Sequence, residues 1–115
     1  MYRVLSISSN SRLLQSRNDA MAMAGFSIIS PKLPEQAPKL IAKQKVDAVV
    51  IGHSVPVLLR KALIIELRRR CPNCIVCFVY VDDFKTQEEP LADVSLDVTH
   101  GSGPLLIALQ ERLPG

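Results

Sequence analysis

The sequence predicts an α/β fold in which helices cover both faces of a parallel β-sheet. Short apolar runs alternate along the chain with longer segments of helical periodicity, as expected when each strand is followed by a crossover helix. Residues 48–51 read Ala-Val-Val-Ile, an unbroken apolar run that suits a strand buried on both faces. With 115 residues, the chain has the size of one domain around one core.

The composition is that of an ordinary globular domain, with 48% hydrophobic and 22% charged residues. No apolar run approaches the roughly 20 residues that span a bilayer, and the N-terminal apolar stretch is too short for a signal peptide. We therefore expect a cytoplasmic protein with no membrane contact. A net charge of +3 and only 4% aromatic residues argue against a nucleic-acid partner.

The first strand is expected over residues 2–8, followed by a helix over residues 12–24. Asn10 or Ser11 can cap this helix by accepting its free N–H groups. Gly25 can then adopt the left-handed conformation that ends many helices. The side chains expected to face the core from this helix are Leu13, Leu14, Met21 and Ala24.

The second strand is expected over residues 26–30. Pro34 suits the first turn of the second helix, which should end near Lys45. The short apolar face of this helix consists of Ala37, Leu40 and Ile41. The buried run at residues 48–51 is then the third strand.

The third helix is expected over residues 57–70, where leucines recur four residues apart. These leucines are Leu59, Leu63 and Leu67. The outer side is expected to carry the cations Arg60, Lys61, Arg68, Arg69 and Arg70. They could form an anion or nucleic-acid patch, or simply a solvated face. Cations are favourable near a helix C-terminus, so we favour the solvated face.

The most β-prone run of the chain, residues 75–81, is the expected fourth strand. Residues 82–90 are polar, with no apolar periodicity apart from Phe84, so the fourth helix is expected to be short or irregular. Residues 94–98 alternate as an edge strand does, and residues 104–113 form the last helix. Its expected inward side chains are Leu105, Leu106, Leu109 and Leu113.

The three cysteines are spaced C-x-x-C-x-x-C, which matches part of an iron–sulfur pattern. There is no fourth cysteine, however, and Cys77 lies inside an apolar strand, where it would be a small core residue. We therefore expect no metal and no cofactor. A Cys71–Cys74 disulfide could form on oxidation but is not expected in the cytosol.

Polar residues follow several of the expected strands, where open α/β sheets place their sites. They are Ser8, Ser9, Asn10, Gly52, His53, Ser54, Asp82, Asp83 and His100. Hydroxyls and an imidazole could hold a small anion, and a serine nucleophile with His53 and Asp82 has the needed residue types. No Gly-x-Ser-x-Gly motif supports the nucleophile. The alternative is structural: Ser8 and Ser9 in a helix-capping turn, Ser54 as a cap, and two loop histidines.

The stretch from Asp47 to Pro56 reads as an acidic residue, an apolar run, Gly52, three residues and proline. Together with Ala24-Gly25-Phe26 before the second strand, it resembles the response-regulator receiver domain of bacterial two-component signalling. The resemblance covers the whole chain as one receiver-like domain, residues 1–115. It implies a flavodoxin-like, CheY-like fold: a doubly wound five-stranded parallel sheet in the order 2-1-3-4-5.

The phosphorylation residues of that family are missing here. Gly52 stands at the phosphoaccepting aspartate, and Ser8 and Ser9 stand where an acidic pair would hold Mg²⁺, which requires oxygen ligands. The expected hydroxyl and lysine after the fourth and fifth strands are absent as well. The chain thus resembles a degenerate pseudo-receiver of a stand-alone Gly-His-Ser-x-Pro type. The altered pocket would comprise Ser8, Ser9, Gly52, His53, Ser54, Tyr80, Val98 and Thr99.

These features predict a non-enzymatic signalling module that acts through protein–protein interaction without aspartyl phosphorylation. A homodimer could form through the last strand and helix, whose residues near that surface are Val94, Leu96, Leu105 and Leu109. One alternative is a sensor of a small anion or other ligand at the strand ends. Another is an active single-domain response regulator of a phosphorelay that uses a displaced acid, Asp82 or Asp83.

Overall fold

The computed structural model describes residues 1–81 and 89–114. In chain order the elements are β1 (Arg3–Ile7), α1 (Ser11–Met23), β2 (Ser27–Ile29), the 3-10 helix η1 (Pro34–Gln36), α2 (Ala37–Lys43), β3 (Ala48–Gly52), α3 (Val57–Arg70), β4 (Ile75–Tyr80), β5 (Val94–Asp97) and α4 (Gly103–Arg112). Each strand falls within two residues of its predicted limits. The fourth helix expected within residues 82–90 falls almost wholly outside the described residues.

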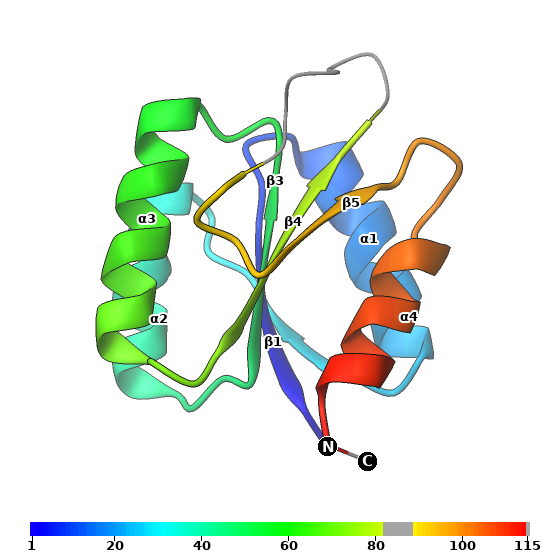
Figure 1. The fold of residues 1–115 in the computed structure, drawn as a ribbon, viewed down its shortest axis with the longest axis horizontal. Coiled ribbons are helices and arrows are strands. Elements are labelled where there is room, and N and C mark those ends of the chain that lie inside the picture. The colour runs from blue at the N-terminus through cyan, green and yellow to red at the C-terminus, as the bar shows by residue number, and fades with distance from the viewer. Residues whose placement is uncertain (82–88, 115) are drawn as a thin grey trace.

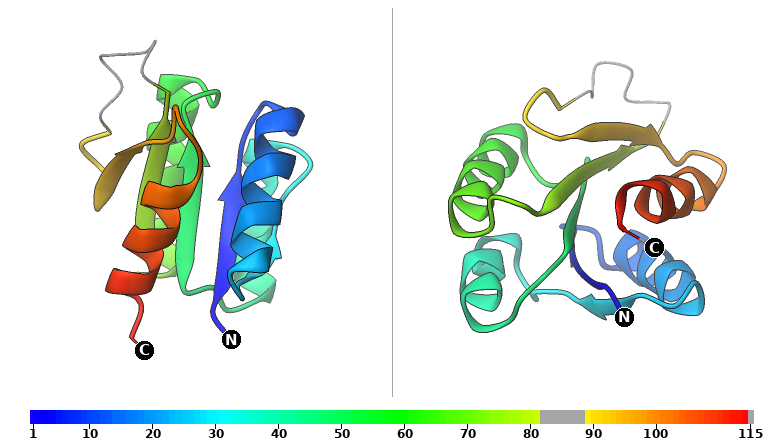
Figure 2. Two further views of the ribbon diagram at one scale, coloured as in Figure 1. Left: turned by 90° about the vertical axis from the view of Figure 1, so that its right-hand side faces the viewer. Right: turned by 60° about the horizontal axis from the view of Figure 1, so that its bottom comes forward.

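The five strands form one parallel sheet in the order β2-β1-β3-β4-β5, which confirms the predicted topology. Helices α2 and α3 cover one face, and α1 and α4 cover the other (Figure 1). The end-on view in Figure 2 shows these three layers directly. The carboxyl ends of the strands therefore meet at one edge of the sheet.

Strand β3 lies at the centre of the sheet, and all five of its residues are buried, as its unbroken apolar run predicts. Alternate side chains point to opposite faces. Val49 and Ile51 pack with α2 and α3, whereas Ala48 and Val50 pack with α1 and α4. The edge strand β5 is only half-buried, consistent with its alternating sequence.

The ends of α1 follow the predicted signals. The side chain of Asn10 accepts a hydrogen bond from the N–H of Leu13 at 3.0 Å, so Asn10 is the N-cap. Gly25 follows the helix with a φ of +99°, a conformation that is unfavourable for residues other than glycine. The second helix is shorter than expected because its first turn, Pro34–Gln36, is a 3-10 helix.

The inward face of α1 differs from the prediction. Met21 is buried as expected, but Leu13 is 43% exposed and Ala24 is also exposed. Arg17, one turn before Met21, is instead only 7% exposed. Its guanidinium finds hydrogen-bond acceptors on β1, which explains how a charged residue can take an inward position.

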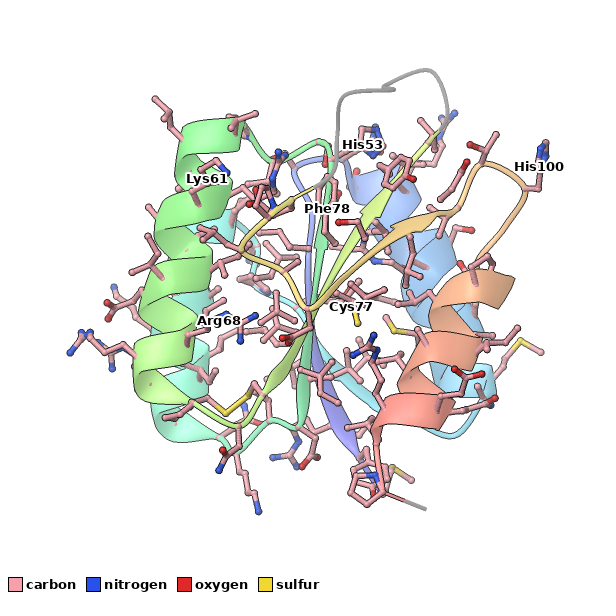
Figure 3. The ribbon with its side chains drawn as sticks, in the orientation of Figure 1. His53, Lys61, Arg68, Cys77, Phe78 and His100 are labelled. Carbon is pink, nitrogen blue, oxygen red and sulfur yellow. A yellow bond between two sulfur atoms is a disulfide. The ribbon has the colours of Figure 1, made fainter. Side chains whose placement is uncertain are left out.

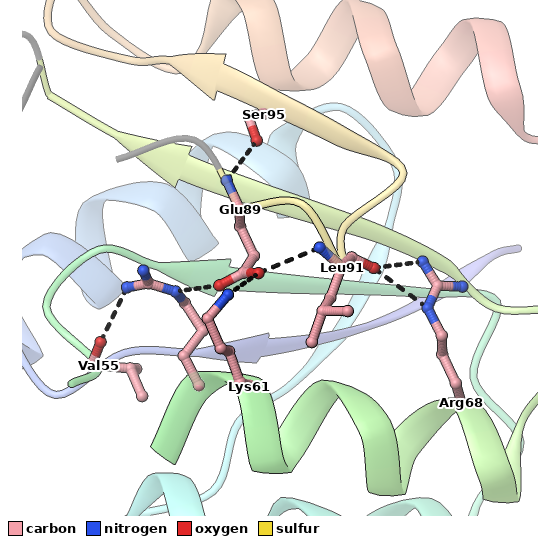
Figure 4. Close-up of polar contacts among 7 residues, drawn as sticks. Val55, Lys61, Arg68, Glu89, Leu91 and Ser95 are labelled. Carbon is pink, nitrogen blue, oxygen red and sulfur yellow. Dashed lines mark hydrogen bonds and ion pairs between the residues drawn. The ribbon is translucent and has the colours of Figure 1, made fainter. Parts of the chain in front are cut away.

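Arg60 was expected on the outer side of α3, and this prediction is wrong. Its side chain is 3% exposed, pairs with the fully buried carboxylate of Glu89 at 2.9 Å, and lies over the Phe78 ring at 4.4 Å. Lys61 reaches the other oxygen of Glu89 at 3.0 Å (Figure 4). The sequence did not reveal this network because Glu89 is 29 residues away from Arg60.

The remaining cations of α3 lie nearer the solvent. Arg69 and Arg70 both pair with Glu66 on the same helix, as expected for a solvated face. Arg68 is partly buried, and its guanidinium donates hydrogen bonds to the carbonyl of Leu91.

The cysteines do not share a site. Cys71 and Cys74 form a disulfide, which the sequence allowed only under oxidation. Cys77, labelled in Figure 3, is buried on the face covered by α1 and α4, whereas Cys74 packs with the residues of the opposite face. Desolvation raises the pKa of the Cys77 thiol to about 12, in keeping with a core residue. Within the described segments, no helix is long and apolar enough to cross a membrane.

Candidate pocket at the strand ends

A cavity of about 110 Å³ lies at the carboxyl ends of the central strands, where Figure 3 places His53. The predicted residues that line it are Ser8, Gly52, His53, Ser54 and Val98. The lining residues outside the predicted set are Leu13, Ser16, Arg17, Val79, Val81, Gly101 and Ser102. The loops after β1, β3 and β5, the end of β4 and the first half of α1 therefore build one pocket with both polar and apolar residues in its wall.

A hydrogen bond between two serine hydroxyls connects the loops that follow β1 and β3. The hydroxyl oxygens of Ser8 and Ser54 are 2.8 Å apart, and the Ser9 N–H donates to the Ser54 hydroxyl at 3.0 Å. The Asn10 N–H donates in turn to the Ser8 hydroxyl at 3.0 Å. Ser54 was expected to cap α3, but Pro56 holds that position and no side chain caps the helix. The serine pair thus fixes the pocket wall.

Arg17 supplies the charge of the pocket. Its Nε donates to the Ser6 hydroxyl at 3.1 Å, and its Nη2 donates to the Ile7 carbonyl at 2.8 Å. Both acceptors are neutral, and no carboxylate in residues 1–81 or 89–114 pairs with the guanidinium. Desolvation lowers the pKa of Arg17 to about 10, so the group remains a cation at neutral pH.

Gly52 makes room for this cation. A Cβ atom built on Gly52 would lie 3.0 Å from Nη1 of Arg17 and 3.8 Å from the Ser8 hydroxyl. The glycine is at the end of a central strand and does not have a positive φ. The missing side chain therefore leaves space for the Arg17 guanidinium, and glycine is not needed here for an unusual backbone conformation.

His53 lies beside the pocket with a partly exposed side chain. Desolvation lowers the pKa of the imidazole, a contact to the Val79 carbonyl partly offsets this, and the charges of Arg17 and Arg60 lower it further. The ring is therefore neutral at physiological pH, and Arg17 is the cation among the described residues that line the pocket.

Three predicted residues do not join the cavity wall. Tyr80 points to the other face of the sheet, where it stacks on Phe78 with ring centroids 6.0 Å apart. Val79 faces the pocket instead, because side chains alternate along β4. Ser9 contributes only its backbone N–H to the serine pair, and the exposed Thr99 bonds to Asp97.

His100 is exposed on its loop, as expected for a loop histidine with no role in the site. Asp82 and Asp83, which the displaced-acid hypothesis needs, lie outside the described residues. Among the described residues, no group of three or more His, Cys, Asp or Glu side chains could hold a metal ion.

The sequence contained one unused signal for Arg17. The residue lies four positions after Leu13 and four before Met21, on the stripe that was assigned to the core. A charged residue inside an apolar stripe indicates either a long side chain reaching solvent or a buried polar contact. Only the packing against β1 and Gly52 decides between them.

No known protein-family description and no curated protein sequence matches the chain. Solved structures do match over nearly all of it. The response regulator TrrA of Thermotoga maritima, crystallised with Mg²⁺ and BeF, has a TM-score of 0.83 at 15% identity, covering 98% of this chain and 100% of TrrA. This chain has the receiver-domain fold.

Two further receivers support the same conclusion. The chemotaxis response regulator CheY4 of Vibrio cholerae has a TM-score of 0.81 at 17% identity, covering 98% of this chain and 99% of CheY4. A CheY-like receiver protein of Methanospirillum hungatei has a TM-score of 0.80 at 13% identity, covering 97% and 93%. The pocket therefore occupies the strand-end edge of a receiver fold.

Proposed function

We propose that this chain is a receiver-like signalling module that works without aspartyl phosphorylation. The observation that carries the proposal is the guanidinium of Arg17, which lies beside Gly52 at the position the resemblance gives to the phosphoaccepting aspartate. A receiver needs carboxylates there, to bind Mg²⁺ and to accept the phosphoryl group. This pocket holds a cation instead.

The difference from a phosphorylated receiver is electrostatic and goes beyond the missing aspartate. Like charges repel, and the repulsion is strong in a partly desolvated pocket. Arg17 would therefore oppose Mg²⁺ binding even if a carboxylate entered from elsewhere. In the part of the chain that the structure describes, the lining residues are serine, histidine, arginine, glycine and apolar residues, none of which replaces the acidic pair. This supports a module whose output does not depend on an acyl phosphate.

Protein contacts are the proposed output, and catalysis is not. The structural neighbour TrrA has been crystallised in complex with the histidine kinase ThkA, so a receiver fold can serve as a protein-binding module. We infer that this chain uses its fold in the same general way, as a regulatory protein in the cytoplasm. Its partner is another protein or a second copy of itself.

A second copy would most simply meet the surface of β5 and α4. Val94 and Leu96 are half-buried there, but Leu105 and Leu109 are fully buried in the core and are not available to a partner. The exposed apolar side chain of α4 is Ile107, at 56%. We expect Ile107→Glu to weaken a dimer in sedimentation equilibrium. Ile65→Glu on α3, also exposed, is the matched control and should not.

Incubation with acetyl phosphate and Mg²⁺, followed by intact-mass analysis, tests the absence of phosphorylation. We expect no phosphoryl adduct under conditions that label an ordinary receiver. A Mg²⁺-dependent adduct would overturn the proposal. Its disappearance in an Asp82→Asn/Asp83→Asn variant would then establish the displaced-acid alternative.

A further inference from the structure

Arg17 is a buried cation without an anionic partner among the described residues. It is only 7% exposed, and its hydrogen bonds are to the neutral oxygens of Ser6 and Ile7 through Nε and Nη2. Nη1 has no hydrogen bond within the described segments and lies at the cavity, beside Gly52. Burying a charge is costly unless a counter-charge compensates it. Nη1 is therefore the guanidinium nitrogen that an anion in the cavity could reach.

We propose that the pocket binds a small oxyanion, such as inorganic phosphate, reversibly and without a metal ion, with Nη1 of Arg17 as its main donor. The proposal deepens the proposed function and rests on it, because it names the ligand that regulates a pocket unable to carry a covalent phosphoryl group. No bond is made or broken in this binding.

The pocket can surround such an anion with donors. Ser16 and Ser102 line it, and their hydroxyls can donate hydrogen bonds. The cavity of about 110 Å³ is well above the roughly 10–15 Å³ that one water requires. Among the described residues, no carboxylate lines it to repel the anion.

Charge and geometry both favour an oxyanion over chloride. A guanidinium presents directed N–H groups that match the oxygens of phosphate or a carboxylate, and such charge-assisted bonds are about twice as strong as neutral ones. Two of the guanidinium nitrogens are already fixed by β1, so the third is held in place before the ligand arrives. This preorganisation reduces the entropic cost of binding.

The test is a titration of the full chain with inorganic phosphate in EDTA, followed by backbone amide NMR, with potassium chloride at equal ionic strength as reference. We expect saturable shifts that centre on Ser8, Arg17 and Gly52, and matching shifts with sulfate. A parallel titration with acetate shows whether the pocket binds carboxylates as well as tetrahedral oxyanions. Equal, non-saturating shifts with chloride would overturn the proposal.

Three variants assign the site. Arg17→Met should weaken phosphate binding by roughly 10- to 100-fold, since a hydrogen bond to a charged group is lost. Arg12→Met removes an exposed cation from the same helix and should leave binding unchanged. Gly52→Asp keeps Arg17 and supplies an internal carboxylate, so it should also abolish binding. Unchanged binding in either pocket variant would overturn the proposal.

The outcomes distinguish this proposal from the proposed function. Covalent phosphorylation would appear as a mass change with acetyl phosphate and Mg²⁺, whereas oxyanion binding leaves the mass unchanged and persists in EDTA. If Arg17→Met does not fold, Gly52→Asp alone decides, because it keeps the arginine, whose guanidinium has to shift by only a few tenths of an ångström to admit the new Cβ.

Discussion

Nη1 of Arg17 lies 3.0 Å from the point where a Cβ atom on Gly52 would stand. The two residues come from α1 and β3 and share one volume at the carboxyl edge of the sheet. The glycine leaves the space, and the arginine fills it with a positive charge. The pocket therefore has a positive charge beside the end of β3.

Gly52→Asp should stabilise the protein. The new carboxylate would stand beside a guanidinium that has no anionic partner among the described residues. Once the guanidinium has shifted by a few tenths of an ångström to admit the new Cβ, the charge-assisted bond should add about 1 kcal/mol to the free energy of unfolding after its desolvation cost. Urea unfolding would measure the gain. Gly52→Asn, nearly the same size but uncharged, is the control and should gain less. A destabilised Gly52→Asp protein with a stable Gly52→Asn protein would contradict the pairing.

Arg17 and Ser6 should be energetically coupled. Removing the guanidinium with Arg17→Met leaves the buried Ser6 hydroxyl without its donor, whereas Ser6→Ala removes the need for one. A double-mutant cycle by urea unfolding should give a coupling of about 1 kcal/mol. A coupling near zero would mean that the hydrogen bond contributes nothing.

His53 should make stability depend on pH. Its pKa is lowered in the folded state, so just below the ordinary histidine value of about 6.5 the unfolded chain binds more protons. The free energy of unfolding should therefore fall as the pH drops from about 6.5 through the folded pKa. His53→Asn should remove this part of the slope in pH-dependent urea unfolding. The exposed residue His100 provides the control, His100→Asn, which should retain the wild-type slope.

Among the acids that the structure describes, Glu89 should be the most costly to neutralise. Burial alone favours its neutral form, but hydrogen bonds from Arg60, the Leu91 N–H and Lys61 outweigh burial and lower its pKa. Glu89→Gln leaves the Arg60 cation buried without its counter-charge, which should cost about 3 kcal/mol in thermal or urea unfolding.

Glu66→Gln is the matched control for Glu89→Gln, because Glu66 pairs with arginines on the surface of the same helix. Its effect should be much smaller than that of Glu89→Gln. Equal effects would mean that burial does not determine the strength of these pairs.

Most of the fold could be predicted from local patterns. The buried run of β3, the cap at Asn10 and the glycine stop at Gly25 each depend on neighbouring residues, so the sequence displays them directly. The limits of α3 were predicted without error for the same reason. Strand order came from the resemblance and is confirmed by the sheet.

The pocket could be predicted only in part. Gly52, His53 and Ser54 follow a recognisable strand, but Arg17 belongs to an apolar helical stripe and is oriented by acceptors on another element. Arg60 was misplaced for a similar reason, because its partner Glu89 is distant in sequence. Tertiary contacts determine whether a long polar side chain lies in the solvent or in the core, and a local sequence pattern does not show these contacts.

A Mg²⁺ titration followed by backbone amide NMR tests the central claim most directly. If Arg17 has replaced the metal site, Mg²⁺ should produce no saturable shifts at Ser8, Gly52 or Val98. Saturable, localised shifts at these residues would contradict the account, because they would show that a divalent cation binds where the structure places a guanidinium.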